Sequence, residues 1–334
     1  MTANGEKMVS EKEKNQGWVY CDRVGPTAAG SSILNFYAER YTHSTREQWR
    51  QRIVAGQIWV GADRVDEPDR VLASGQNLRY QRPPWMEAAV PTVVPIVFDD
   101  DDLLIVDKPA GLPVLPGGEF LENTLLWIMR SRHGATMAPL HRLGRGTSGL
   151  IAFAKSVAAR REVSADFANG RVSKTYRALV NGRPPTDELT ITVPIGRVPY
   201  APLGRVFAAV DTAASEHKAS RSEVHVLEHN EATRESLVAV EIPTGRPHQI
   251  RIHLAAAGHP LVGEPLYLPG GLPRQPVAGQ PPALPGDGGY HLHSTRLRLR
   301  HPTVPGVVIS LWSLPPVVLR TREERQVGEA LHSS

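Results

Sequence analysis

Residues 141–150 concentrate the groups that could do chemistry, and they read HRLGRGTSGL. The part from Gly144 to Gly149 satisfies the GxGxxG pattern, which binds a dinucleotide when a strand precedes it and a helix follows. Here the apolar residues that follow predict a strand, so the context argues against a nicotinamide enzyme. We interpret the segment as a tight, glycine-rich turn whose backbone amides could face a phosphate.

A second feature with possible chemistry is the pair His291 and His293. Two histidines one residue apart can bind a metal, but a protein metal site normally needs further Cys, His or carboxylate ligands. No cysteine lies close to this pair in the sequence, and the nearest acidic residue, Asp287, does not complete such a ligand set alone. We therefore expect structural roles for both histidines, and neither a metal nor another cofactor.

Four more segments carry distinctive residues, at 101–112, 174–182, 244–254 and 258–267. Together with residues 141–150, they resemble the RluA-type RNA pseudouridine synthases in order and spacing. The resemblance covers about residues 92–315. In that family the first run reads His-Arg-Leu-Asp, two variable residues, Thr-Ser-Gly and an aliphatic residue, and the Asp is the catalytic carboxylate. In this sequence Gly144 stands at that position.

The resemblance implies isomerisation of uridine to pseudouridine in structured RNA, ribosomal or transfer, by base flipping and without a cofactor. The bond between ribose C1′ and base N1 breaks, the base turns, and C5 bonds to C1′. When C1′ gains positive charge, a carboxylate beside it can attack that carbon or stabilise the charge. In the second mechanism proposed for the family, the carboxylate removes a proton from C2′. Glycine can do neither, and losing such a group costs orders of magnitude in rate.

The resemblance also implies roles for three residues that are present. Arg142 enters the base stack where the target base has left, Tyr176 packs on the flipped base and could take the C5 proton, and Arg251 is the basic partner of the acid. The alternatives are a phosphate contact or ion pair for Arg142, a half-buried strand tyrosine for Tyr176, and phosphate binding or an ion pair elsewhere for Arg251. Neighbouring residues expected to contact RNA are His141, Arg145, Thr147, Lys174, Arg246, His248 and Gln249.

Two functions stay open because of Gly144. The first is a synthase whose carboxylate comes from elsewhere, with Asp107 and Glu264 as the nearest candidates in the sequence. The second is a non-catalytic RNA-binding or RNA-folding protein that retains the synthase fold. Retention of the three site residues favours the first.

Composition is compatible with a soluble protein that binds nucleic acid. The chain has 334 residues, a net charge of +4 and seven lysines against 31 arginines, and arginine suits phosphate and stacks on bases. The single Cys21 excludes an internal disulfide and agrees with a reducing compartment. Residues 1–16 lack the apolar core of a signal peptide, and no apolar run approaches the ~20 residues that span a bilayer. We expect a cytoplasmic monomer without membrane contact.

The domain organisation follows from changes of pattern along the chain. Residues 1–28 are predicted to be a disordered tail. Residues 29–83 show helical spacing and a short strand, and resemble an S4-type RNA-binding domain; an unspecialised small α+β domain is the alternative. A proline-rich linker over 84–95 precedes a synthase-like domain over 96–320 and a tail over 321–334.

The pattern within residues 96–320 predicts an α+β domain with a mixed, largely antiparallel sheet. A hairpin is expected around the acidic turn 99–102, and a helix from Ser156 as N-cap to Gly170. A strand over 172–180 should place Lys174, Tyr176 and Ala178 on one face. Further predicted elements are strands at 150–155, 222–227, 236–242, 296–299 and 307–312, a helix at 247–257 and a surface loop at 268–289.

Overall fold

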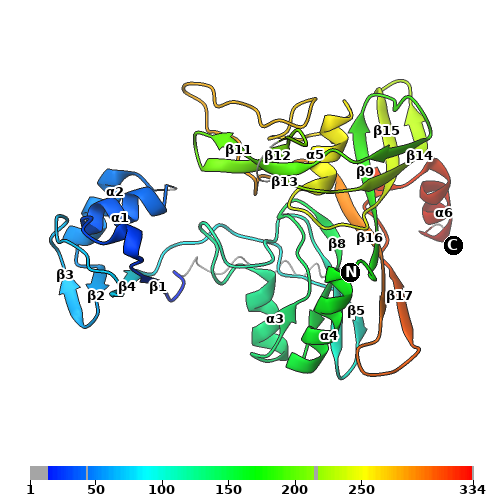
Figure 1. Ribbon diagram of the computed structural model, residues 1–334. Helices are drawn as coiled ribbons and strands as arrows, with labels where there is room; N and C mark the ends of the chain where they lie inside the picture. Colours follow the sequence, from blue (N-terminus) through cyan, green and yellow to red (C-terminus); the bar gives the residue numbers. More distant parts are fainter. Residues whose placement is uncertain (1–13, 43, 214–216, 333–334) are drawn as a thin grey trace, which may run out of the picture. The chain divides into compact units, whose positions relative to one another are not determined.

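The computed structural model describes residues 14–42, 44–213 and 217–332 and divides into two compact units. The small unit contains the described residues up to Ala88 together with Pro202–Gly204. The large unit contains Ala89–Ala201 and the described residues from Arg205 onward. Figure 1 shows both units, coloured along the chain.

The small unit combines two helices with a four-stranded antiparallel sheet in the order β1-β4-β2-β3. Thr45 and Gln48 form a capping box that fixes the start of the second helix. Tyr37 and Trp49 stack with ring centroids 4.7 Å apart and join the two helices in one core. The elements are β1 (Trp18–Arg23), η1 (Pro26–Ala28), α1 (Ile33–Arg40), α2 (Arg46–Val54), β2 (Ile58–Val60), β3 (Asp63–Val65) and β4 (Asn77–Arg82).

The predicted disordered tail over residues 1–28 is wrong for its second half. Trp18–Arg23 forms β1, which pairs along its whole length with β4. Its side chains are mostly exposed, so the strand shows no alternation of buried and exposed residues and is held mainly by backbone hydrogen bonds to β4. Residues 1–13 of the predicted tail lie outside the described residues.

The large unit is built on a ten-stranded sheet. Eight strands follow the order β10-β14-β15-β9-β16-β8-β6-β5, while β17 pairs with β16 and β7 with β8. The pairs are antiparallel except β16–β8, which is parallel. The strands are β5 (Ile96–Asp99), β6 (Leu103–Lys108), β7 (Ala138–Pro139), β8 (Ser148–Ala154), β9 (Ser173–Asn181), β10 (Glu188–Ile191), β14 (Ser222–Asn230), β15 (Glu235–Glu241), β16 (Leu292–Arg300) and β17 (Val308–Trp312).

Helices and a small second sheet complete the large unit (Figure 1). The helical elements are α3 (Leu125–His133), α4 (Val157–Ala168), α5 (Gln249–Ala256), η2 (Val317–Leu319) and α6 (Arg322–His332). The second sheet has the order β12-β11-β13, with β11 (Ile195–Tyr200), β12 (Gly204–Ala209) and β13 (His217–Lys218).

Both faces of the large sheet are covered by apolar cores. Strand β8 is buried along its length, and its residues alternate between two clusters: Ile151 and Phe153 join one, Leu150 and Ala152 the other. Helices α3 and α5 contribute to the first cluster and α4 to the second. A strand covered on both faces reads as a continuous apolar run, as β8 does.

These observations confirm the predicted fold class, a mixed and largely antiparallel α+β domain with a small N-terminal α+β unit. The β5–β6 hairpin, the Ser156 N-cap of α4 and the alternate burial of β9 are as predicted. The predicted C-terminal tail over 321–334 contains a helix, α6, over Arg322–His332. Within the described residues, no helix has both the length and the apolar character to cross a membrane.

Candidate active site

Residues 141–147 form the glycine-rich turn between β7 and β8, and residues 148–150 begin β8; the turn is held by the end of β6. The Lys108 side chain is fully buried, and its Nζ donates to the carbonyl oxygens of Pro109, Leu112 and Arg145 at 2.9, 2.7 and 3.3 Å. The Gly111 amide donates to the same Arg145 oxygen at 2.8 Å. Burial lowers the pKa of Lys108 to about 7. The segment 101–112, which contains Lys108 and Gly111, therefore anchors the backbone of the turn.

The turn enters the sheet through Gly149. Its φ is +105°, and a Cβ there would lie 2.3 Å from the backbone oxygen of Ser294, its partner in the parallel β8–β16 pairing. A side chain would separate the two strands. Gly149 thus fixes the position of the preceding turn against β16.

Gly144 faces a tyrosine hydroxyl. A Cβ placed on Gly144 would lie 2.9 Å from Tyr290 Oη and 3.4 Å from Thr147 Oγ1, and among the described residues these are the heavy atoms within 4 Å, chain neighbours aside. Tyr290 is 5% exposed, and its hydroxyl is hydrogen-bonded to Thr147 Oγ1 at 3.2 Å. The position that the resemblance assigns to an acid therefore has a buried phenol beside it.

Arg251 on α5 is a buried, fixed cation. Its Nε and Nη2 donate to the two carboxylate oxygens of Glu264 at 2.8 and 2.6 Å, and its Nη1 donates to Pro285 O at 2.9 Å. Burial disfavours the charge, but the hydrogen bonds and charge of Glu264 outweigh it, and the pKa of Arg251 lies above its ordinary value. The guanidinium carbon lies 4.4 Å from the ring centroid of Tyr290, so Arg251 and Gly144 are joined through this ring.

Neither acid suggested by the sequence as a substitute lies beside Gly144. Glu264 is committed to Arg251 and also accepts from the backbone amides of Leu266 and Tyr267. Asp107 accepts from the hydroxyl of Ser313. Neither carboxylate is among the atoms within 4 Å of a Cβ at residue 144, where the Tyr290 hydroxyl lies instead.

Arg142 and His248 bring a second cation to the same region. Burial, followed by the charges of Arg251 and Arg142, lowers the pKa of His248 to about 3, so the ring is neutral at physiological pH. The Tyr267 hydroxyl donates to Phe207 O at 3.0 Å and is 2.7 Å from His248 Nδ1, which assigns the ring proton to Nδ1. Arg142 is exposed and has no hydrogen-bond or ion-pair partner in the described part of the chain.

Tyr176 lies on β9 in the apolar core of the large unit. It is 5% exposed, is paired across the sheet with Ser294 and Val240, and belongs to the same apolar cluster as Leu143 and Tyr290. Burial raises the pKa of Tyr176 to about 12, against a smaller opposing effect of the Ser294 hydroxyl. Its phenol is therefore protonated at physiological pH.

Four of the residues expected to contact RNA are bound within the protein. His141 Nε2 accepts from the Ala152 amide at 3.1 Å, and burial together with Lys174 lowers the pKa of His141 to about 3. Lys174 is 8% exposed, and burial lowers its pKa to about 8. Gln249 is 3% exposed and uses both ends of its amide in hydrogen bonds, while Thr147 is bonded to Tyr290. These four side chains are thus engaged in contacts or burial within the protein, and their contact with RNA stays a prediction.

Two arginines from the same expected set are only partly used. Arg145 Nε donates to Gly286 O at 2.7 Å, and its Nη2 is 3.6 Å from Asp287. Arg246 Nε donates to Ala219 O at 3.1 Å. Both side chains keep further N–H groups and lie partly at the surface.

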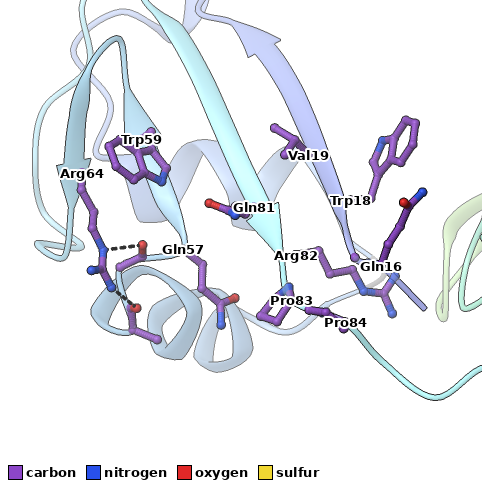
Figure 2. Close-up of a pocket in the computed structure, with 13 residues that line it drawn as sticks. Gln16, Trp18, Val19, Gln57, Trp59, Arg64, Gln81, Arg82, Pro83 and Pro84 are labelled. Atoms are coloured by element: carbon purple, nitrogen blue, oxygen red, sulfur yellow. Dashed lines mark hydrogen bonds between the residues drawn. The ribbon is translucent and has the colours of Figure 1, made fainter. Parts of the chain in front are cut away.

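A separate cavity of about 760 Å³ lies within the small unit. Figure 2 shows Trp18 and Arg82 on one part of its wall and Trp59 and Arg64 on another. Arg64 is tied down by hydrogen bonds to Gly56 O and Ala55 O at 2.8 and 2.9 Å, and Trp18 is 45% exposed. The exposed Trp18 ring and the partly buried Trp59 ring, with the arginines beside them, offer stacking surfaces and positive charge.

Tyr290 was not predicted as a site residue from the sequence. It follows the proline- and glycine-rich segment 268–289, which gave no local pattern. The available signal was indirect: glycines at both 144 and 146 leave room for a large neighbour. Among the described residues, no group of three or more His, Cys, Asp or Glu side chains is arranged to hold a metal.

Comparison with known proteins identifies the family. Residues 102–256 match the family described as RNA pseudouridylate synthase. An RNA pseudouridine synthase of Synechocystis sp., itself uncharacterised, is 41% identical over 288 residues, which are 86% of this chain and 95% of that protein. RNA pseudouridine synthase 5 of Oryza sativa subsp. japonica is 39% identical, over 94% of the length of this chain and 91% of the length of that protein.

A further bacterial relative and a solved structure point to the same family. Ribosomal large subunit pseudouridine synthase D of Nitrosomonas europaea is 35% identical, over 77% of the length of this chain and 69% of the length of that protein. The structure of human RNA pseudouridylate synthase domain containing 1 has a TM-score of 0.53 at 25% identity, over 75% of this chain and 98% of its own. These likenesses favour an enzyme over the non-catalytic alternative. The chain belongs to the RNA pseudouridine synthase family and is an RNA-modifying isomerase.

Proposed function

We propose that the large unit isomerises uridine in structured ribosomal or transfer RNA after extruding the target base. The observation that carries this proposal is the combination of exposed Arg142, which has no partner in the described part of the chain, with the buried and fixed Arg251–Glu264 pair. Extruding a base costs a few kcal/mol, and a guanidinium that stacks or binds phosphate can offset that cost. Arg142 is free to do so.

Within this proposal the other site residues have defined tasks. Gly144 stands at the position of the family's acid, so the reaction runs without a carboxylate at that point. Tyr176 forms the apolar floor on which the flipped base packs, with its phenol protonated. Arg251 supplies a fixed positive charge behind Tyr290. Arg145 and Arg246 contribute surface donors for RNA phosphates.

We propose further that the small unit is an S4-like RNA-binding domain. Its cavity is lined by indole rings and arginines, which suit unpaired bases and phosphates. We propose that the protein acts as a cytoplasmic monomer, and the single cysteine, which excludes an internal disulfide, is compatible with a reducing compartment. Size-exclusion chromatography with light scattering tests the monomer, and a fluorescent fusion tests the location.

Pseudouridine mapping of total RNA tests the activity. RNA from cells with and without the gene is compared, and the deletion strain is complemented with the wild-type gene, an Arg142→Ala variant and an Arg160→Ala variant. Arg160 is an exposed arginine on α4 and provides the matched control. We expect one or more sites to vanish on deletion, and to return with the wild type and the control but not with Arg142→Ala. A deletion strain with an unchanged pseudouridine map contradicts the proposal.

A further inference from the structure

The space beside residue 144 is occupied by the Tyr290 hydroxyl. A Cβ on Gly144 would stand 2.9 Å from Tyr290 Oη, closer than real side chains approach. An aspartate at 144 and the hydroxyl at 290 therefore exclude each other in the present conformation. Building on the proposed function, we propose that Tyr290 is the catalytic residue that replaces the family's carboxylate at ribose C1′.

The turn is shaped around this tyrosine at a second position. A Cβ on Gly146 would lie 3.0 Å from Tyr290 Cζ, 3.1 Å from its Cε1 and 3.0 Å from Gly288 Cα. Gly144 makes room for the hydroxyl and Gly146 for the ring. The two glycines and the tyrosine form one arrangement, so Gly144 belongs to a rebuilt site rather than to a decayed one.

Two contacts orient the phenol. The Arg251 guanidinium lies 4.4 Å from the ring centroid and is itself held by Glu264 with both side chains nearly fully buried. Thr147 Oγ1 lies 3.2 Å from Oη and accepts the phenol proton as a hydrogen bond in this proposal. The lone pairs of Oη then face the space beside residue 144. A fixed oxygen needs no reorganisation when a positive charge develops beside it.

The reaction balances without any other reactant. The C1′–N1 bond breaks and its electron pair leaves with the uracil, while C1′ gains positive character next to Oη. The base turns, and the C5–C1′ bond forms from the uracil anion. The proton lost from C5 passes to water and N1 takes one up, so Tyr290 stabilises charge and ends unchanged.

Three variants test the role of Tyr290, with Tyr37→Phe as the matched control. Tyr37 is a 1% exposed tyrosine in the core of the small unit, and its hydroxyl has no hydrogen-bond partner among the described residues. The variants are Tyr290→Phe, Gly144→Asp and the double variant Gly144→Asp/Tyr290→Phe. The measurements are the single-turnover rate of pseudouridine formation in RNA from the deletion strain, the Kd for that RNA, and Tm.

Tyr290→Phe should lower the rate by about 10²-fold, as removal of one preorganised polar group does, with Kd and Tm unchanged. Gly144→Asp should lose activity because its Cβ meets Oη. The double variant should exceed both single variants in rate, since removing Oη leaves Thr147 Oγ1 as the atom within 4 Å among the described residues. Tyr37→Phe should match the wild type.

Tyr290→Phe at the wild-type rate overturns the assignment while the proposed function stands. Gly144→Asp faster than the wild type also overturns it, because Tyr290 would then only fill space. A wild-type protein that binds RNA but forms no pseudouridine in any RNA from the deletion strain overturns the proposed function, and this assignment with it.

Discussion

The buried side chain of Lys108 holds the turn at residues 141–147, and its ionisation makes the stability of the protein depend on pH. In the folded protein burial lowers its pKa from 10.5 to about 7. Between these values the unfolded chain binds a proton that the folded protein does not, so this group makes unfolding less favourable as pH rises from about 7 to about 10. Below pH 7 both states are protonated and the full burial cost remains.

We therefore expect the free energy of unfolding to rise across this pH range by a few kcal/mol more in the wild type than in Lys108→Met, at about 1.4 kcal/mol for each unit of pKa shift. Urea unfolding at several pH values measures both curves. Other titrating groups, including Lys174, contribute equally to the two proteins and cancel in the difference. Parallel curves would show that Lys108 titrates normally in the fold.

The Arg251–Glu264 pair gives a second prediction at this scale. Replacing Glu264 by Gln removes one charge and leaves a buried guanidinium uncompensated, which costs about 3–5 kcal/mol. The double variant Arg251→Met/Glu264→Leu should recover much of that loss, because no charge is left buried. Chemical denaturation of the wild type, Arg251→Met, Glu264→Leu and the double variant closes a double-mutant cycle, and Glu264→Gln is measured beside them. A loss below about 1 kcal/mol for Glu264→Gln would mean that water reaches the pair.

Arg142, Tyr176 and Arg251 could be predicted as site residues because each lies in a motif, but their partners were not predictable from the sequence. Glu264 is close to Arg251 in the sequence, and its pairing depends on the turn after α5. Tyr290 reaches Gly144 across more than a hundred residues of chain, through pairing of β8 with β16. Contacts of this length depend on sheet order, which local patterns do not encode.

At the scale of elements, caps and periodicity predicted structure where they were clear. Helix α4 begins after Ser156, whose side chain accepts from the Ala159 amide as expected of an N-cap. Helix α6 carried a similar signal that the charged composition obscured: Thr321 and Glu324 exchange the hydrogen bonds of a capping box. Glu324 also pairs with Arg177 on β9 at 3.0 Å, a contact that no local pattern predicts.

Strand β1 gives a prediction for the element that the sequence analysis assigned to a tail. Trp18 lies on the wall of the small unit's cavity and is 45% exposed (Figure 2). If an RNA base stacks there, Trp18→Ala should weaken RNA binding by about 1–3 kcal/mol. Trp312→Ala on β17 is the matched control, since that indole is 53% exposed in the large unit. Filter binding measures the RNA affinity of both variants. If Trp18→Ala and Trp312→Ala bind RNA equally well, the cavity is not part of the RNA-binding surface.

For the whole molecule, charge is the property that bears on RNA most directly. The excess of basic over acidic residues is small and gives a net charge of +4, but 31 of the 38 basic residues are arginines. Several of these, among them Arg171 and Arg300 on Asp166, are committed to ion pairs and do not add to a binding surface. Affinity for RNA must therefore come from the arginines left free, such as Arg142, rather than from net charge.

This distribution of charge leads to a prediction about salt. Phosphate contacts release counterions, so the logarithm of the RNA association constant should fall linearly with the logarithm of salt concentration. Loss of one phosphate contact lowers the slope by about one unit. We expect Arg142→Ala to reduce both the affinity and the slope, and Arg160→Ala on α4 to change neither, when binding is titrated between about 50 and 200 mM KCl. If Arg142→Ala weakens binding but leaves the slope unchanged, the Arg142 guanidinium of the wild type stacks in the vacated base position instead of neutralising a phosphate. If Arg142→Ala leaves the affinity unchanged, Arg142 is excluded from the RNA interface.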